Sequence, residues 1–195
     1  MQILLFNKIF GNIVKIEAIY PPYIYSIKYD DQKVNEFERL LEEWRDLDKM
    51  IAFFEENSEY LKADIWAAVS EPEAAVDQVA NEADDLEILL SDLFNNAESH
   101  EQPDFDDYFK YLNGRYRFDY EYVPMKSYGR CSPSLIRLYA IKLKANLYII
   151  TGGGVKLCKT IQESPGLKDH VMQNIMAVKS WLKDNDIYTE EEFIN

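Results

Sequence analysis

Hydrophobic and polar residues alternate in two short segments near the start of the chain. The first segment is IVKIEAIY, at residues 13–20, and the second is YIYSIKY, at residues 23–29. Alternation with a period of two is typical of a half-buried strand. Pro21 and Pro22 lie between the segments and break any continuous strand. The pattern therefore predicts an N-terminal pair of strands.

The spacing of the hydrophobic residues changes after residue 31. From residue 34 onward they recur at intervals of three and four, which predicts a helix over 33–61 that is broken near Asp46. The other face of this helix is acidic, and we interpret it as facing solvent. It consists of Glu36, Glu38, Glu42, Glu43, Asp46, Asp48, Glu55 and Glu56.

A second helix is predicted over residues 70–94, SEPEAAVDQVANEADDLEILLSDLF. Ser70 with Glu73 three residues later, and Pro72 in the first turn, form a capping signal. The segment that follows, NNAESHEQPDFDD at 95–107, is rich in polar residues and predicts an exposed loop.

The remaining segments predict a sheet and a closing helix. YRFDYEYVPM, at 116–125, alternates as a half-buried strand. SLIRLYAIKL, LYIIT and VKLCK predict a meander of three antiparallel strands, with a turn at Gly152–Gly154 between the last two. An amphipathic helix over 165–183 and a short helix at TEEEF follow. The predicted fold class is α+β: acidic helices plus an antiparallel β-meander packed by a C-terminal helix.

Charge divides the 195 residues into two unlike halves. Residues 1–107 hold 8 Lys and Arg against 26 Asp and Glu, whereas residues 108–195 hold 13 against 9, and the net charge of the chain is −14. We predict a single domain over 1–195, with an acidic strand-pair and helical half (1–107) and a basic meander and C-terminal helix half (108–195).

The basic half contains its own concentration of positive charge. Residues 108–162 have 10 basic residues against 2 acidic ones, interleaved with tyrosines. Basic and aromatic side chains together favour contact with a polyanion through phosphate contacts and stacking. The alternative is that this segment docks against the acidic half of the same chain.

Several classes of protein are excluded by what the chain lacks. Lys8, Lys15 and Glu17 interrupt the apolar N-terminus before it reaches the length of a membrane span, and no secretory signal is apparent, so we expect a cytoplasmic protein with no membrane contact. Cys131 and Cys158 lack C-x-x-C spacing and are expected to be free thiols. We expect no metal and no other cofactor.

Two motifs invite a more specific interpretation. Three glycines before a lysine resemble a phosphate-binding loop, but the Walker pattern opens a helix and these glycines are followed by a strand pattern. Glu82 and Asp85, with Asp84 and Glu87 beside them, resemble the paired carboxylates with which helical nucleotide pyrophosphatases hold Mg²⁺. A metal-dependent hydrolase is therefore one alternative.

A broader resemblance covers about residues 130–182. The segment IRLYAI, the polar turn KLKAN, the strand LYIIT, a glycine turn, VKLCKT and a final helix occur in this order. This order resembles the C-terminal half of RelE/ParE-superfamily toxins, in which helices also precede a meander sheet. The chain is also similar to a bacterial family of comparable length with an RLYAI…NLYVITGG core, a resemblance that implies no function.

The toxin resemblance implies a chemistry and a set of residues. Its RNA-cleaving members imply a ribosome-dependent endoribonuclease in which a 2′-hydroxyl attacks the adjacent phosphate. Arg137 matches the strand arginine, and Lys156 and Lys159 match the basic residues after the last strand, so these three are the candidate catalytic residues. The reaction needs cations and a group that moves a proton. The segment after Lys159 has no tyrosine, which leaves His170 as a candidate for that role.

The partners that follow from this resemblance are RNA or the ribosome and an antitoxin-like protein. A different class of function is also open at this point. The chain is then a non-enzymatic protein-interaction module that binds a basic partner through its acidic helices.

Overall fold

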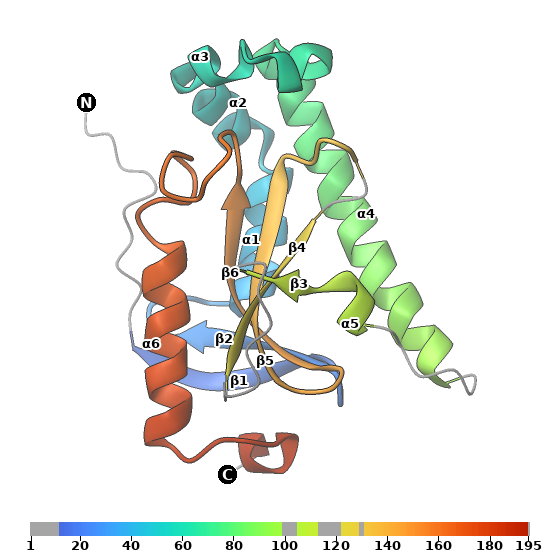
Figure 1. Ribbon diagram of the computed structural model, residues 1–195, viewed down its shortest axis with the longest axis vertical. Helices are drawn as coiled ribbons and strands as arrows, with labels where there is room; N and C mark the ends of the chain where they lie inside the picture. Colours follow the sequence, from blue (N-terminus) through green and yellow to red (C-terminus); the bar gives the residue numbers. More distant parts are fainter. Residues whose placement is uncertain (1–11, 99–104, 113–121, 129–130, 195) are drawn as a thin grey trace.

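The computed structural model describes residues 12–98, 105–112, 122–128 and 131–194. Figure 1 shows a twisted sheet in the middle, with α1 behind it, α4 to its right and α6 to its left. The fold class is α+β, as the sequence predicts.

The sheet has six strands in the order β1-β2-β6-β5-β4-β3. Neighbouring strands are antiparallel except β2 and β6, which are parallel. The predicted N-terminal strand pair is confirmed, and through β2 it joins the meander in one sheet. The strand predicted over 116–125 is seen only in its last part, because residues 113–121 lie outside the described ranges. The strands are β1 Ile13–Tyr20, β2 Ile24–Tyr29, β3 Lys110–Tyr111, β4 Val123–Tyr128, β5 Ile136–Lys144 and β6 Leu147–Val155.

The turn predicted at Gly152–Gly154 is wrong. β6 runs through the three glycines without interruption, and the hairpin turns instead at Ala145 and Asn146. A Cβ atom on Gly153 would lie 2.6 Å from the carbonyl oxygen of Arg137 and 2.9 Å from Leu40. Gly153 therefore allows α1 to pack directly on β6, and Gly154 allows the segment at Gly166 to approach closely in the same way. The separate strand predicted for VKLCK, at 155–159, is wrong: Val155 is the last residue of β6, and residues 156–159 follow it outside the sheet.

The helices follow the predicted periodicity, with differences at their ends. The break near Asp46 is confirmed, and the Asp46 carboxylate caps α2 by accepting the backbone N–H of Lys49 at 3.1 Å. The loop predicted over 95–107 is helical at both ends, in α4 and α5, and the last long helix begins at residue 171 and not at 165. The helices are α1 Glu36–Arg45, α2 Leu47–Glu56, α3 Ser58–Leu61, η1 Asp64–Val69, α4 Pro72–Glu98, α5 Phe105–Tyr108, α6 Val171–Asp184 and η2 Glu190–Ile194.

The two faces of the sheet bury different sets of side chains. On β5, Ile136, Leu138 and Ala140 belong to the core that is shared with α1, α2 and α4. Tyr139 and Ile141 point to the other face, where α6 packs. This is the division that the period of two in IRLYAI predicts.

One acidic residue of the face predicted to be solvated is buried. The side chain of Glu36 is fully buried and accepts hydrogen bonds of 2.8 Å from Arg39 Nε and Nη2, and Gln32 also donates to it. A buried carboxylate requires such donors because it has lost its hydration.

Within the described ranges, no helix combines the length and apolar character that crossing a membrane requires.

Candidate anion-binding site

The candidate site lies over the end of the sheet where β4 and β6 finish and β5 begins. The register places Tyr128 opposite Arg137 and Lys126 opposite Tyr139. Because alternate residues of a strand share a face, these four side chains form one block on the face that α6 covers. Cations and tyrosines alternate within the block.

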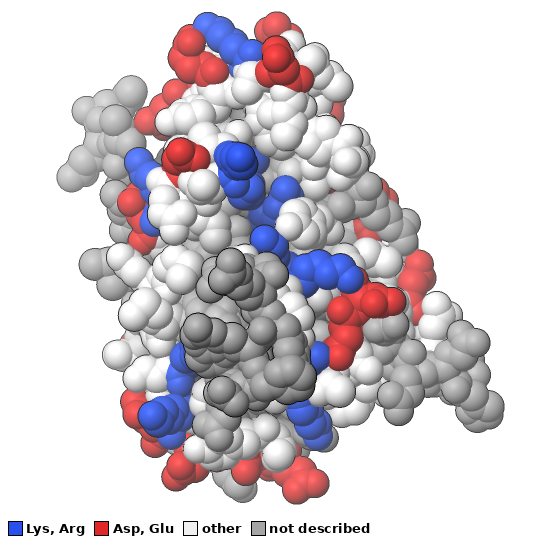
Figure 2. Space-filling view, in the orientation of Figure 1, with Lys and Arg blue, Asp and Glu red and all other residues white. Residues whose placement is uncertain are grey.

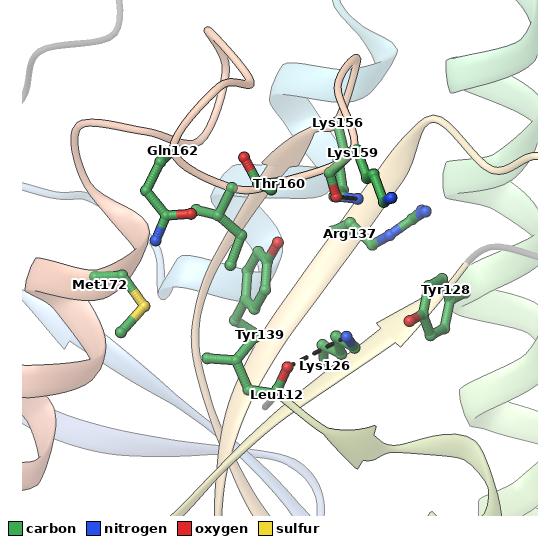
Figure 3. A pocket seen from close by; sticks show the side chains of 11 residues that line it. Leu112, Lys126, Tyr128, Arg137, Tyr139, Lys156, Lys159, Thr160, Gln162 and Met172 are labelled. Carbon is green, nitrogen blue, oxygen red and sulfur yellow. Dashed lines mark hydrogen bonds between the residues drawn. The ribbon is translucent and has the colours of Figure 1, made fainter. Parts of the chain in front are cut away.

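The segment after β6 completes a hollow above this block. The backbone N–H of Lys156 donates to the carbonyl of Leu135 at 2.7 Å, so the chain keeps its pairing for one residue beyond the strand. It then curves over the sheet and encloses a volume of about 250 Å³. Figure 3 shows Arg137, Lys156 and Lys159 beside one another on one side of the hollow, and Gln162 and Met172 on the other. We call this the cationic hollow; it is lined by Leu112, Lys126, Tyr128, Arg137, Tyr139, Lys156, Lys159, Thr160, Ile161, Gln162 and Met172.

The guanidinium of Arg137 is held by its own strand. Its Nη1 atom donates to the carbonyl of Ser134 at 2.9 Å and to that of Ile136 at 2.5 Å. Its Cζ atom lies 4.4 Å from the centre of the Tyr128 ring, a cation–π contact. The residue is only 9% exposed. These contacts fix one edge of the guanidinium and hold its plane in a single orientation.

Two lysines of the hollow are also oriented by backbone carbonyls. Lys126 Nζ donates to the carbonyl of Leu112 at 3.3 Å, and Lys156 Nζ donates to that of Lys159 at 2.8 Å. An ammonium group has three donors, so each lysine keeps donors for a ligand.

Within the described ranges, the charges of this hollow are not balanced by carboxylates. Among the described residues, no carboxylate lies within ion-pair distance of Lys126, Arg137, Lys156 or Lys159. Figure 2 shows a group of Lys and Arg side chains near the middle of this face. In contrast, Arg45 pairs with Asp84 and Glu87 at 2.7 and 2.6 Å. The chain is acidic overall, yet the described part of this surface is locally positive.

Burial and mutual repulsion lower two pKa values in the hollow. Burial lowers the pKa of the Arg137 guanidinium. Burial also lowers the pKa of Lys156, and the positive charges of Arg137 and Lys126 lower it further. A bound anion would relieve both effects, because it restores the favourable surroundings that the charged forms lack. The electrostatics therefore favour a ligand with negative charge.

Glu82 on α4 anchors the start of β5 from the other face of the sheet. Its side chain is fully buried, and it accepts backbone N–H groups of Leu135 and Ile136 at 3.0 Å. It also accepts the Ser134 hydroxyl at 2.7 Å. The carbonyls of Ser134 and Ile136 are the acceptors that hold Arg137. Glu82 is thus a support for the arginine.

The metal-dependent alternative finds no support in this arrangement. The oxygens of Glu82 are occupied by the donors at the start of β5 and by Gln78 Nε2 at 2.6 Å. Asp84 pairs with Arg45 on the exposed side of α4. Among the residues that the structure describes, no three His, Cys, Asp or Glu side chains are grouped as metal ligands.

A second hollow adjoins the first and shares three of its residues. It encloses about 650 Å³ and is lined mainly by apolar side chains. Arg137, Lys156 and Lys159 belong to both hollows and form a ridge between them. We call the second one the apolar hollow; its other lining residues are Glu59, Tyr60, Ala63, Ile65, Trp66, Pro133, Leu157 and Cys158.

The structure brings together the three residues that the sequence singles out, Arg137, Lys156 and Lys159. His170 does not join them: its Nε2 atom lies 3.2 Å from the carbonyl oxygen of Gly153, and the residue is not among those that line either hollow. Sequence reasoning missed Lys126, Tyr128 and Tyr139. Their signal is the pattern cation-x-tyrosine, which occurs in β4 at Lys126 and in β5 at Arg137. That the two patterns lie side by side is visible only once the register is known.

The alternative prediction, that the basic segment docks against the acidic half of the chain, is confirmed for Lys142. Lys142 Nζ pairs with Asp106 Oδ2 at 2.6 Å. The lysines and the arginine of the cationic hollow do not pair in this way with any described carboxylate.

Comparisons of the chain with models of protein families, with curated proteins and with solved structures give no match. The chemistry of the hollow is therefore the basis for a function.

Proposed function

We propose that this protein binds RNA through the cationic hollow and cleaves it, as a toxin-like endoribonuclease of the RelE/ParE type that acts in the cytoplasm. The observation that carries the proposal is the grouping of Arg137, Lys126, Lys156 and Lys159 in one hollow without a described carboxylate partner. The order of helices, antiparallel hairpin and closing helix supports the resemblance.

Binding follows from the donors that the hollow offers. Arg137 presents a guanidinium of fixed orientation, which suits the oxygens of a phosphodiester. Lys126 and Lys156 add point charges with donors to spare. Tyr128, which is 41% exposed, gives the block an aromatic surface on which a base or sugar can pack.

Cleavage requires charge stabilisation and two proton transfers. The 2′-oxygen forms a bond to phosphorus, the bond to the 5′-oxygen breaks, and the products are a 2′,3′-cyclic phosphate and a 5′-hydroxyl. Arg137 and Lys126 are the groups that we assign to the charge that develops on the phosphate oxygens. Lys156 is the group that we assign to both proton transfers. In its neutral form, which its lowered pKa makes more accessible than in an ordinary lysine, it takes the proton of the 2′-hydroxyl, and as the ammonium it gives that proton to the 5′-oxygen.

Tyr139 is a weaker candidate for accepting a proton. The residue is 1% exposed, and burial raises the pKa of its hydroxyl above the ordinary value. It therefore stays protonated at neutral pH and can act only as a donor. This contrast is the reason for assigning the accepting role to Lys156.

The test is controlled expression of the chain in bacteria. We expect growth to stop and messenger RNA to be cut, and we expect the variant with Arg137→Ala and Lys156→Ala to restore both growth and intact transcripts. Lys183→Ala is the matched control, because it removes an exposed lysine at the end of α6 and leaves the hollow unchanged. Normal growth with intact transcripts in cells that contain the folded wild-type protein would remove the nuclease proposal.

A second candidate function rests on the acidic helices. Glu38, Glu42, Asp48, Glu55 and Glu56 are exposed, and none of the five forms an ion pair with a described residue. Such a surface suits a basic protein partner. Capture of a basic partner that weakens with salt and is abolished by Glu38→Lys with Glu42→Lys would favour this function, and capture that is unchanged by these substitutions would oppose it.

A further inference from the structure

The apolar hollow contains features that phosphate binding does not explain. It is the larger of the two volumes, at about 650 Å³ against about 250 Å³. Two of its residues leave large apolar side chains in solvent, since Tyr60 is 42% exposed and Ile65 is 60% exposed. An anion alone has no use for such a surface, because apolar groups offer it no donors.

The floor of the apolar hollow is rigid. Trp66 is 4% exposed, and its indole N–H donates to the carbonyl of Leu157 at 2.9 Å. This bond ties η1 to the segment that follows β6, which is the same segment that carries Lys156 and Lys159. The apolar wall and the cationic ridge are therefore fixed relative to each other.

The positively charged side chains of the apolar hollow lie on one side of it. Arg137, Lys156 and Lys159 lie on the ridge that faces the cationic hollow. The one carboxylate of the described lining, Glu59, is bonded to Lys62. A ligand that spans the ridge thus meets cations in the middle and an apolar surface beyond them. A nucleotide has this distribution, with an anionic phosphate joined to a flat ring of low charge.

We propose that the apolar hollow is a base-binding subsite, which takes the base of a nucleotide whose phosphate lies on the ridge formed by Arg137, Lys156 and Lys159. This inference rests on the proposed RNA-binding function and deepens it. Away from the ridge, the Trp66 N–H is bonded to Leu157 and the Glu59 carboxylate is paired with Lys62, so the base is held by its face against Tyr60 and Ile65 and not by its edge. The subsite therefore accepts any of the four bases.

The test compares two hexamers that carry the same phosphates. One is hexathymidylate, and the other is a hexamer of abasic tetrahydrofuran units; both lack the 2′-hydroxyl and cannot be cleaved by its attack. With wild-type protein at low salt, we expect the thymidylate to bind about tenfold more tightly, which is the order of one stacked base. Tyr60→Ala and Ile65→Ala are each expected to narrow this ratio and to leave the binding of the abasic hexamer unchanged.

The controls are matched in exposure and lie elsewhere in the fold. Tyr188→Ala removes a tyrosine that is 40% exposed after α6, and Ile88→Ala removes an isoleucine that is 52% exposed on α4. Neither is expected to change the ratio. In Figure 1, α3 and the C-terminal helix η2 lie at opposite ends of the molecule, so Tyr188 tests a distant aromatic surface.

The remaining outcomes separate the two proposals. Equal binding of both hexamers overturns the base subsite and leaves the phosphate site standing. A tenfold ratio that survives both Tyr60→Ala and Ile65→Ala also overturns the subsite, because the base then binds somewhere else. If neither hexamer binds wild-type protein, the proposed RNA binding fails, and the subsite fails with it.

Discussion

The hydroxyl of Ser134 donates a hydrogen bond of 2.7 Å to the carboxylate of Glu82, and the carbonyl of Ser134 accepts one of 2.9 Å from Arg137. Ser134 therefore connects a buried acid on one face of the sheet to the cationic hollow on the other. We therefore expect the geometry of the hollow to depend on Glu82, which lies on the opposite face of the sheet.

Replacement of Glu82 should show this dependence. In Glu82→Gln, an amide N–H₂ replaces one of the two carboxylate oxygens, each of which accepts at least two hydrogen bonds, so at least two buried hydrogen bonds are lost. We expect the free energy of unfolding to fall by about 2–4 kcal/mol. Urea unfolding measures the loss, and Glu73→Gln on the exposed start of α4 is the control, with an expected change below about 0.5 kcal/mol. Equal stability of the Glu82 and Glu73 variants would show that the buried bonds are unimportant.

The close packing of α1 on β6 gives a second prediction. A methyl group at Gly153 would lie 2.6 Å from the Arg137 carbonyl oxygen and 2.9 Å from Leu40. We expect Gly153→Ala to destabilise the protein by about 1–3 kcal/mol, as overpacking does. The double variant Gly153→Ala, Leu40→Ala should lose less free energy of unfolding than the sum of the losses in the two single variants. Leu40→Ala removes one of the groups with which the new methyl group clashes. Strictly additive free energies in the double-mutant cycle would contradict the contact.

Asp106 gives a prediction about acid stability. Burial by itself would raise its pKa, but Lys142, the Tyr148 hydroxyl and the backbone N–H of Asn146 hold the pKa below its ordinary value. A lowered carboxyl pKa contributes stability above the unfolded value of about 3.9, and this contribution is lost as the pH falls through the folded value. We expect wild type to exceed Asp106→Asn by about 1–2 kcal/mol at pH 6 and by less at pH 3. A gap that is the same at both pH values would refute the role of the ionised carboxylate.

Lys156 gives the corresponding prediction for binding. Its pKa is lowered by burial and by the charges of Arg137 and Lys126, and an anion binds more tightly to the protonated form. The affinity for an RNA oligonucleotide should therefore fall as the pH rises through this lowered pKa, which lies below the ordinary lysine value. In Lys156→Arg, whose side chain stays charged, the fall should move to higher pH. Fluorescence anisotropy between pH 7 and pH 10 measures the shift, and coincident curves for the two proteins would exclude Lys156 as the titrating group.

The sequence was sufficient for the fold class and for part of the site. The period of two in IRLYAI predicts that Arg137 and Tyr139 share a face, and the structure has them on one face. The break at Asp46 is visible in the sequence because helical spacing and a capping residue coincide there. Both features depend on local interactions, which short stretches of sequence express.

The features that the sequence did not reveal depend on contacts between distant residues. Gly152–Gly154 resemble a turn, and only contacts with distant segments, α1 against Gly153 and Gly166 against Gly154, show why small residues are needed in this strand. Glu36 and Glu82 resemble surface acids of their helices, and their burial depends on partners whose proximity the helical pattern does not predict. Lys126 joins the hollow through the register of β4 on β5, which the period of two leaves open.

The measurement that tests the central claim most directly is the salt dependence of RNA binding. Each cation that contacts a phosphate of single-stranded RNA contributes about 0.7 to the slope of log affinity against log salt concentration. We expect the double variant Lys126→Ala, Lys156→Ala to reduce this slope by about 1.4 and Lys183→Ala to leave it unchanged. An unchanged slope in the double variant, or an equal reduction in the control, would show that RNA is not bound in the cationic hollow.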